Sequence, residues 1–91
     1  MSEKLVVSLD DDLATISIIE DDDVLYNHSR RILSAEDKSA LMLNIKSMLK
    51  IYGFELVFDD GDNRINVSVE FISSMIEQMK YEERDDDPFT L

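Results

Sequence analysis

The sequence contains no cysteine, so it can form neither a disulfide framework nor a thiolate metal site. It also has no tryptophan, only one proline and only two glycines. No apolar run approaches the roughly 20 residues that a membrane-spanning helix needs, and the first residues lack the basic and apolar segments of a secretion signal. We therefore expect a soluble, cytoplasmic protein without a membrane partner.

Basic side chains are scarce as well. Nine Lys and Arg stand against 21 Asp and Glu, which gives a formal net charge of −12 over 91 residues. Proteins that bind nucleic acid directly neutralise its phosphates with Lys and Arg, so this composition argues against direct nucleic-acid binding. Apolar residues make up 44% of the chain, which is enough for one modest core and too much for a disordered acidic tail.

Polar and apolar residues alternate along four short segments, which is typical of half-buried strands. The segments are residues 4–9 and 14–18, followed later by 54–58 and 64–69. The short connection within each pair predicts two antiparallel hairpins.

Two other segments have the apolar spacing of helices. Residues 34–52 begin with Ser34, a good N-cap, and are followed by Gly53, a residue suited to a left-handed C-cap. A final helix is predicted from about residue 68 or 69 to residue 79. Residues 24–33 leave strand and helix open, and their composition favours a strand.

The expected fold class is therefore α+β: a small antiparallel sheet of two hairpins, with residues 24–33 as an optional further strand, and two or three helices packed on one face. The predicted core consists of Leu5, Val7, Ile16, Ile18, Leu41, Ile45, Met48, Phe54, Leu56, Ile65, Ile72, Ile76 and Met79.

The domain prediction is one globular domain over residues 1–83 and an acidic, flexible C-terminal tail over residues 84–91. Residues 82–89, EERDDDPF, resemble the acidic C-terminal tip of bacterial single-stranded-DNA-binding proteins. That resemblance implies docking of the tail on a basic, hydrophobic pocket. The alternative is a tail that only improves solubility.

No segment has a convincing catalytic or metal-binding pattern. Residues 59–70 have the length of an EF-hand loop, but Gly61 occupies a ligand position and Arg64 occupies the position of the sharp glycine turn. Residues 18–24 resemble the first strand and acidic pocket of response-regulator receiver domains, yet the chain is too short for that fold. The only histidine, His28, has no nucleophile pattern around it. We expect no enzyme activity, no catalytic residue, no metal and no cofactor.

The acidic residues are concentrated in short clusters between the apolar segments. Turn chemistry explains one or two aspartates at each junction, but not three in a row. We therefore expect these clusters to contact a partner, and we expect raised pKa values where like charges crowd together. The candidate partner-binding residues are Asp10, Asp11, Asp12, Glu20, Asp21, Asp22, Asp23, Asp59, Asp60, Asp62, Asp85, Asp86 and Asp87.

A globule of this size is about 30 Å across, and 30 Å of B-DNA carries about 18 phosphates, half of them on one side. The net charge of −12 is thus comparable to one face of DNA. In its size, its charge, its aspartate clusters and its lack of catalytic motifs, the chain resembles phage-encoded acidic DNA-mimic inhibitors such as the anti-restriction nuclease and anti-CRISPR proteins. The resemblance implies a basic DNA-binding protein as partner: a restriction enzyme, a nuclease or a nucleoid protein.

Three further points stay open at the level of sequence. A homodimer would present a longer acidic surface than a monomer. Nuclease-immunity proteins and antitoxins are also small, acidic and non-catalytic, but usually bind one cognate toxin. An acidic protein–protein adaptor is a third class, in which the charge serves mainly solubility.

Overall fold

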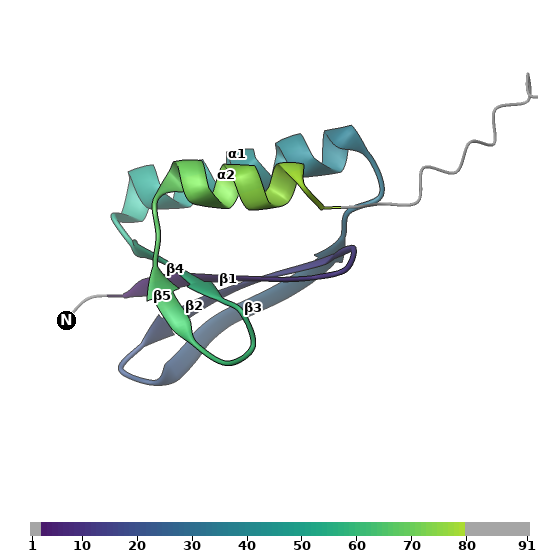
Figure 1. Cartoon of the computed structure of the whole chain (residues 1–91). Helices are drawn as coiled ribbons and strands as arrows, with labels where there is room; N and C mark the ends of the chain where they lie inside the picture. The colour runs from purple at the N-terminus through teal and green to yellow at the C-terminus, as the bar shows by residue number, and fades with distance from the viewer. Residues whose placement is uncertain (1–2, 80–91) are drawn as a thin grey trace, which may run out of the picture.

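A computed structural model describes residues 3–79 of the chain. This part contains a five-stranded sheet and two helices (Figure 1). The elements in chain order are β1 (Lys4–Asp10), β2 (Leu13–Glu20), β3 (Asp23–Arg31), α1 (Ala35–Tyr52), β4 (Glu55–Asp59), β5 (Arg64–Asn66) and α2 (Val69–Glu77). The α+β class is therefore confirmed, and residues 23–31 form a strand.

The sheet is mixed rather than antiparallel, which corrects the sequence-based expectation. Its strand order is β3-β2-β1-β4-β5, and β1 pairs with β4 in parallel while the other neighbours are antiparallel. The reason is the connection through α1, which runs back along the sheet after β3. The chain then enters β4 at the end of the sheet where β1 starts, so Lys4 pairs with Glu55.

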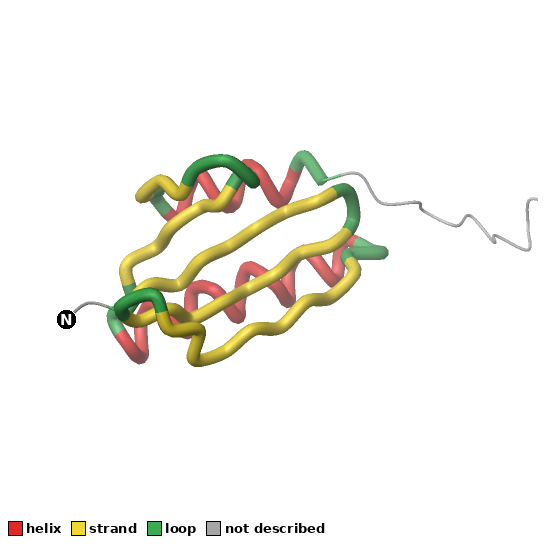
Figure 2. The backbone as a smooth tube through the Cα atoms, turned by 90° about the horizontal axis from the view of Figure 1, so that it is seen from below, coloured by secondary structure: helices red, strands yellow, loops and turns green. Residues whose placement is uncertain are grey.

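Both helices cover the same face of the sheet, as expected (Figures 1 and 2). The hydroxyl of Ser34 accepts a hydrogen bond from the Asp37 N–H and caps α1, and Gly53 ends it with φ 68°. Ser68 caps α2 in the same way by accepting from the Phe71 N–H. These local signals explain why the helix boundaries could be predicted closely.

The main core lies between the sheet and the helices. Its buried members are Leu5, Val7, Ala14, Ile16, Ile32, Leu41, Ile45, Leu56, Phe58, Ile72, Ile76 and Met79, with Ile18, Met48 and Phe54 partly buried against them. The predicted core is thus largely confirmed, but Ile65 is wrong because its side chain is 46% exposed. It lies on β5, a three-residue edge strand whose residues are all exposed.

A second, smaller apolar cluster lies on the opposite face of the sheet. It consists of Val6, Ile19 and Val57, which are all buried although neither of the helices in residues 3–79 covers this face. In the alternation of their strands, Val6 is on the same side as Ser8, and Val57 is on the same side as Glu55.

The predicted tail, residues 84–91, and with it Asp85, Asp86 and Asp87, lies outside the described residues, as does the end of the predicted domain at residue 83. Within residues 3–79, neither helix has the length and apolar content required to cross a bilayer.

Candidate functional site

The three described acidic clusters occupy the three hairpin turns of the sheet. The β1–β2 turn (residues 10–12) and the β4–β5 turn (residues 59–63) lie at one end of the sheet, because β1 and β4 are parallel and Asp59 pairs with Ser8. The β2–β3 turn (residues 20–23) lies at the other end. At about 3.3 Å per residue, the eight residues of β2 separate the two ends by about 25 Å.

The structure therefore brings two of the predicted clusters to the same end of the sheet and keeps the third apart. In Figure 1 the β2–β3 and β4–β5 turns both curve below the sheet, on the side away from the helices. The acidic residues thus lie at two opposite ends of the uncovered face rather than in one stripe. We call this uncovered face of the sheet the open face.

In the β2–β3 turn, Asp21, Asp22 and Asp23 are all exposed. The turn is a two-residue hairpin in which Asp21 and Asp22 both have left-handed backbones, with φ 48° and 71°. Two consecutive residues with positive φ are the signature of a type I′ turn, for which Asn-Gly is strongly preferred. An aspartate in this conformation costs about 1 kcal/mol, and two adjacent charges repel each other as well. The chain therefore has acidic residues where other residues would give a more stable turn.

The β1–β2 turn divides its aspartates between two roles. Asp11 has φ 53° and is exposed, and within the described residues its carboxylate has no partner. The Asp12 carboxylate instead accepts a 2.7 Å hydrogen bond from Nη1 of Arg31, and its backbone carbonyl accepts from the Ile32 N–H at 2.6 Å. Asp12 thus connects the turn to the end of β3.

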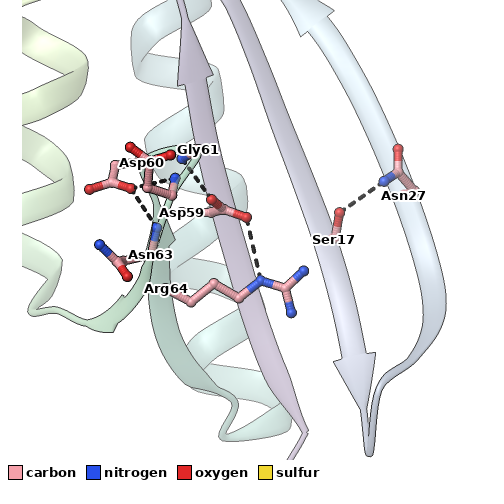
Figure 3. Close-up of polar contacts among 8 residues, drawn as sticks. Ser17, Asn27, Asp59, Asp60, Gly61, Asn63 and Arg64 are labelled. Carbon is pink, nitrogen blue, oxygen red and sulfur yellow. Dashed lines mark hydrogen bonds and ion pairs between the residues drawn. The ribbon is translucent and has the colours of Figure 1, made fainter.

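In the β4–β5 turn, two carboxylates stabilise the backbone (Figure 3). Asp59 Oδ1 accepts from the Gly61 N–H at 2.8 Å, and Asp60 Oδ1 accepts from the N–H groups of Asp62 and Asn63 at 2.9 and 2.8 Å. The Asn63 and Asp62 N–H groups hold the pKa of Asp60 below the ordinary value of an aspartate, because they stabilise the charged form. The expectation of raised pKa values in the acidic clusters is therefore wrong for Asp60.

Asp59 has a second interaction, which involves the basic residue that follows the turn. Its Oδ2 lies 3.4 Å from Nε of Arg64, and the Arg64 side chain extends from β5 over the open face (Figure 3). Turn chemistry thus explains Asp59 and Asp60, and only Asp62 in this cluster has no partner for its carboxylate among residues 3–79.

The predicted site residues consequently fall into two groups. The carboxylates of Asp12, Asp59 and Asp60 have structural partners. Within residues 3–79, the carboxylates without a hydrogen bond or ion pair are those of Asp10, Asp11, Glu20, Asp21, Asp22, Asp23 and Asp62. The second group is the part of the predicted site that is available to a partner, and four of its seven members are consecutive.

The open face also contains a hollow that sequence reasoning missed. It has a volume of about 370 Å³ and is lined by Lys4, Val6, Ile19, Asp21, Asp22, Val57, Arg64 and Asn66. Its apolar residues are the small cluster of Val6, Ile19 and Val57, and charges of both signs surround them. The available signal was a valine in β1 and another in β4 at positions that alternate with the main-core residues, where a polar residue would be expected.

The rest of the open face carries small polar side chains. Thr15 and Ser29 share a 2.8 Å hydrogen bond between β2 and β3, and Asn27 donates to Ser17 at 2.9 Å (Figure 3). These four side chains are thus hydrogen-bonded in pairs across the strands, and none of them carries a charge.

What the site can do chemically is accept hydrogen bonds and attract positive charge. Among residues 3–79, no three Asp, Glu or His side chains converge in a way that could hold a metal ion. Comparison of the chain with known proteins gives no match to a family model, a curated protein or a solved structure.

Proposed function

We propose that this protein is an acidic DNA mimic that acts in the cytoplasm. It binds the basic DNA-binding surface of a restriction enzyme, nuclease or nucleoid protein and excludes DNA from that surface. The observation that carries the proposal is the β2–β3 turn. Four consecutive carboxylates, from Glu20 to Asp23, lack a partner within the described chain, and Asp21 and Asp22 adopt left-handed backbones.

The other common reasons for placing acid in a turn do not account for this one. A turn selected for stability would contain Asn-Gly, because both residues tolerate positive φ. Acid selected for ion pairing would have a partner, as Asp12 has in Arg31. Acid selected for solubility would be interspersed with lysine and would not need strained positions. Contact with a basic partner is the remaining role, and backbone strain of this kind is concentrated at functional sites.

The spacing of the turns supports a partner that binds DNA. The two acidic ends of the sheet are about 25 Å apart, and over that length B-DNA carries about 15 phosphate charges. Strand β2, which connects the two ends, is hydrogen-bonded to β1 on one side and to β3 on the other. This pairing keeps the distance between the two ends constant. A basic cleft that follows a DNA backbone would contact both ends at once.

The test is a protection assay with a labelled duplex and a panel of probes: a type II restriction endonuclease, a nonspecific nuclease and a nucleoid protein. Replacement of residues 21–23 by Asn removes three charges and preserves turn propensity. The matched control is the triple variant Glu36→Gln, Glu70→Gln and Glu77→Gln, which removes three exposed charges from the helices. We expect the turn variant to lose about 5- to 150-fold in inhibition, and the control much less.

Three outcomes would overturn the mimic proposal. The first is equal loss of inhibition in the turn variant and in the helix control, which would mean that only overall charge matters. The second is a ternary complex in which the target holds duplex DNA and this protein together. The third is binding that survives about 0.5 M NaCl, where screening is nearly complete.

A nuclease-immunity or antitoxin role is the second candidate, and the hollow on the open face favours it. Lys4 and Arg64 flank the apolar residues there, and a basic DNA-binding cleft would repel both side chains. A single cognate toxin with a complementary surface would instead use them. Lys4→Gln distinguishes the two roles: it should strengthen binding to a DNA-binding cleft and weaken binding to a cognate toxin. If Lys4→Gln has no effect and no probe is bound, an acidic adaptor becomes the better description.

A further inference from the structure

Strand β3 forms one edge of the sheet and is unusually open. Eight of its nine residues are exposed, and within the described chain it pairs with β2 alone. Val24, Leu25 and Tyr26 are exposed to 59%, 57% and 43%. Natural edge strands are normally short or protected by proline or lysine, because their free N–H and C=O groups can pair with another strand. Apart from the irregularity in its pairing opposite Ile18 and Ile19, and from the charged residues Asp23, Arg30 and Arg31 at its two ends, β3 has none of these protections.

The charges along β3 are ordered from one end to the other. The strand follows the acidic residues 20–22 and begins with Asp23, and it ends with Arg30 and Arg31. If a second copy of β3 pairs antiparallel with the first, the acidic end of each copy lies beside the basic end of the other. A parallel copy would place acid beside acid. The edge is therefore complementary to itself in one orientation only.

We propose that β3 pairs antiparallel with β3 of a second copy of this chain, about a twofold axis at Asn27. The two sheets then form one continuous ten-stranded sheet. This pairing places Tyr26 opposite His28 of the second copy, and it brings the acidic start of β3, beyond the extra residue Leu25, beside the Arg30–Arg31 end of that copy. Arg31 is 64% exposed although it also reaches Asp12, so its guanidinium has donors left for a second carboxylate.

The side chains near the axis support this register. Tyr26 and His28 are two residues apart on β3, with ring centroids 6.4 Å apart. Both are exposed although they point to the side of the sheet that carries the helices. In the pair they would form a cluster of four rings, and cross-strand aromatic pairs are among those that stabilise sheets. The other edge strand, β5, has only three residues and offers no comparable contact.

The pairing rests on β3 alone and does not depend on the proposed function, but it would extend the acidic surface. The ten-stranded sheet has two sides at which its strands end. Each of these sides would carry the β2–β3 turn of one copy and the β1–β2 and β4–β5 turns of the other. With strands about 4.8 Å apart, the first two of these turns would be about 14 Å apart. One acidic turn of each of the three kinds would then lie along the same side of the sheet.

The absence of cysteine from the chain provides a direct test. Cysteine is introduced singly as Tyr26→Cys, Asn27→Cys and His28→Cys, and as Asp62→Cys for a control on an exposed turn. Disulfide formation is followed in a glutathione redox buffer, and the mass of the unmodified protein is followed by analytical ultracentrifugation. We expect a concentration-dependent shift toward twice the 10.5 kDa chain mass, and crosslinking that is greatest for Asn27→Cys.

Charge reversal tests the same register independently. Asp23→Lys places a positive charge beside the basic end of the second copy at both ends of the contact and should weaken dimerisation about tenfold. Asp62→Lys makes the same change in net charge away from β3 and should not weaken it. The double variant Asp23→Arg, Arg31→Asp should restore dimerisation.

A sedimenting monomer at every concentration, with crosslinking at Asn27→Cys no faster than at Asp62→Cys, would overturn the proposal. A dimer that forms without preference for Asn27→Cys and without rescue by the double charge exchange would also overturn it, because another surface would then be used. Neither measurement includes a DNA-binding protein, so failure here is distinguishable from failure of the proposed function.

Discussion

Asp12 and Arg31 form the shortest ion pair among the described residues, with 2.7 Å between Oδ1 and Nη1. The pair joins the β1–β2 turn to the last residue of β3, and the neighbouring Ile32 N–H donates to the Asp12 carbonyl. The adjacent Asp11 has no partner in the described chain. Neighbouring acids of one triplet therefore have different roles, one structural and one exposed to a partner.

The first prediction follows from this difference. Asp12→Asn should lower the free energy of unfolding by up to about 1 kcal/mol, because the ion pair with Arg31 is only partly exposed on the Asp12 side. Asp10→Asn removes the same charge without removing a contact and should leave stability unchanged or slightly higher. Urea unfolding of both variants provides the comparison. An equal loss of unfolding free energy in Asp12→Asn and Asp10→Asn would mean that the Asp12–Arg31 ion pair contributes nothing to stability.

The second prediction concerns the β2–β3 turn. The double variant Asp21→Asn, Asp22→Gly should raise the free energy of unfolding by about 1–2 kcal/mol, because Asn-Gly suits a type I′ turn. For a domain of this size that corresponds to a rise in Tm of roughly 4–16 °C. The same variant should inhibit a target less well than the parent.

A single-site comparison separates backbone strain from charge in this turn. Asp22→Asn removes the charge, whereas Asp22→Gly removes the charge and also relieves the backbone at φ 71°. The glycine variant should therefore be the more stable of the two. If both variants are equally stable, charge repulsion alone explains any gain in the double variant.

The third prediction concerns the core. Ile45→Ala and Ile72→Ala should each cost about 2–5 kcal/mol, because both side chains are fully buried between the helices and the sheet. Ile65→Ala should cost less than 1 kcal/mol, since that side chain is 46% exposed. Thermal unfolding of the three variants would test the burial directly, and similar losses at Ile65 and Ile45 would contradict it.

The fourth prediction is a pH dependence from Asp60. Its folded pKa is lowered by the Asn63 and Asp62 N–H groups, so the folded state favours the charged carboxylate. Its contribution to stability is present above the unfolded pKa of about 3.9 and is lost as the pH falls through the lower folded value. Asp60→Asn should therefore be less stable than the parent at about pH 7, and the difference should shrink below about pH 4. Asp62→Asn, which removes an unpaired carboxylate, should show no such loss at neutral pH.

The fifth prediction concerns salt. Raising NaCl from about 10 to about 150 mM shortens the screening length from about 30 to 8 Å. The net charge is −12, and the excess negative charges repel one another more in the compact folded state than in the expanded unfolded state. Added salt should therefore raise the Tm. A Tm that falls with added NaCl would contradict an accumulation of unpaired acid on the folded surface.

Local chemistry made much of this fold predictable from the sequence. Period-two alternation predicted β1, β2, β4 and β5, whereas residues 24–33 were left open between strand and helix. Ser34 and Gly53 predicted the ends of α1, because a cap acts within one turn of the helix. The positions of the acidic clusters in turns were also predictable, since short apolar segments flank them. The alternation does not indicate which strands are neighbours in the sheet. The parallel pairing of β1 with β4 was therefore missed, and an antiparallel sheet was expected.

Tertiary structure alone decided which acidic residues are available. Arg31 meets Asp12 only because β3 returns to the β1–β2 turn, and Asp59 meets Arg64 only across a hairpin. The second apolar cluster required β1, β2 and β4 to lie side by side, which places Val6, Ile19 and Val57 together. The sequence by itself determined the composition, the charge and every helix and strand except β3. The pairing of strands distant in sequence determined which charges are neutralised, because an ion pair or an apolar contact depends on distance in space.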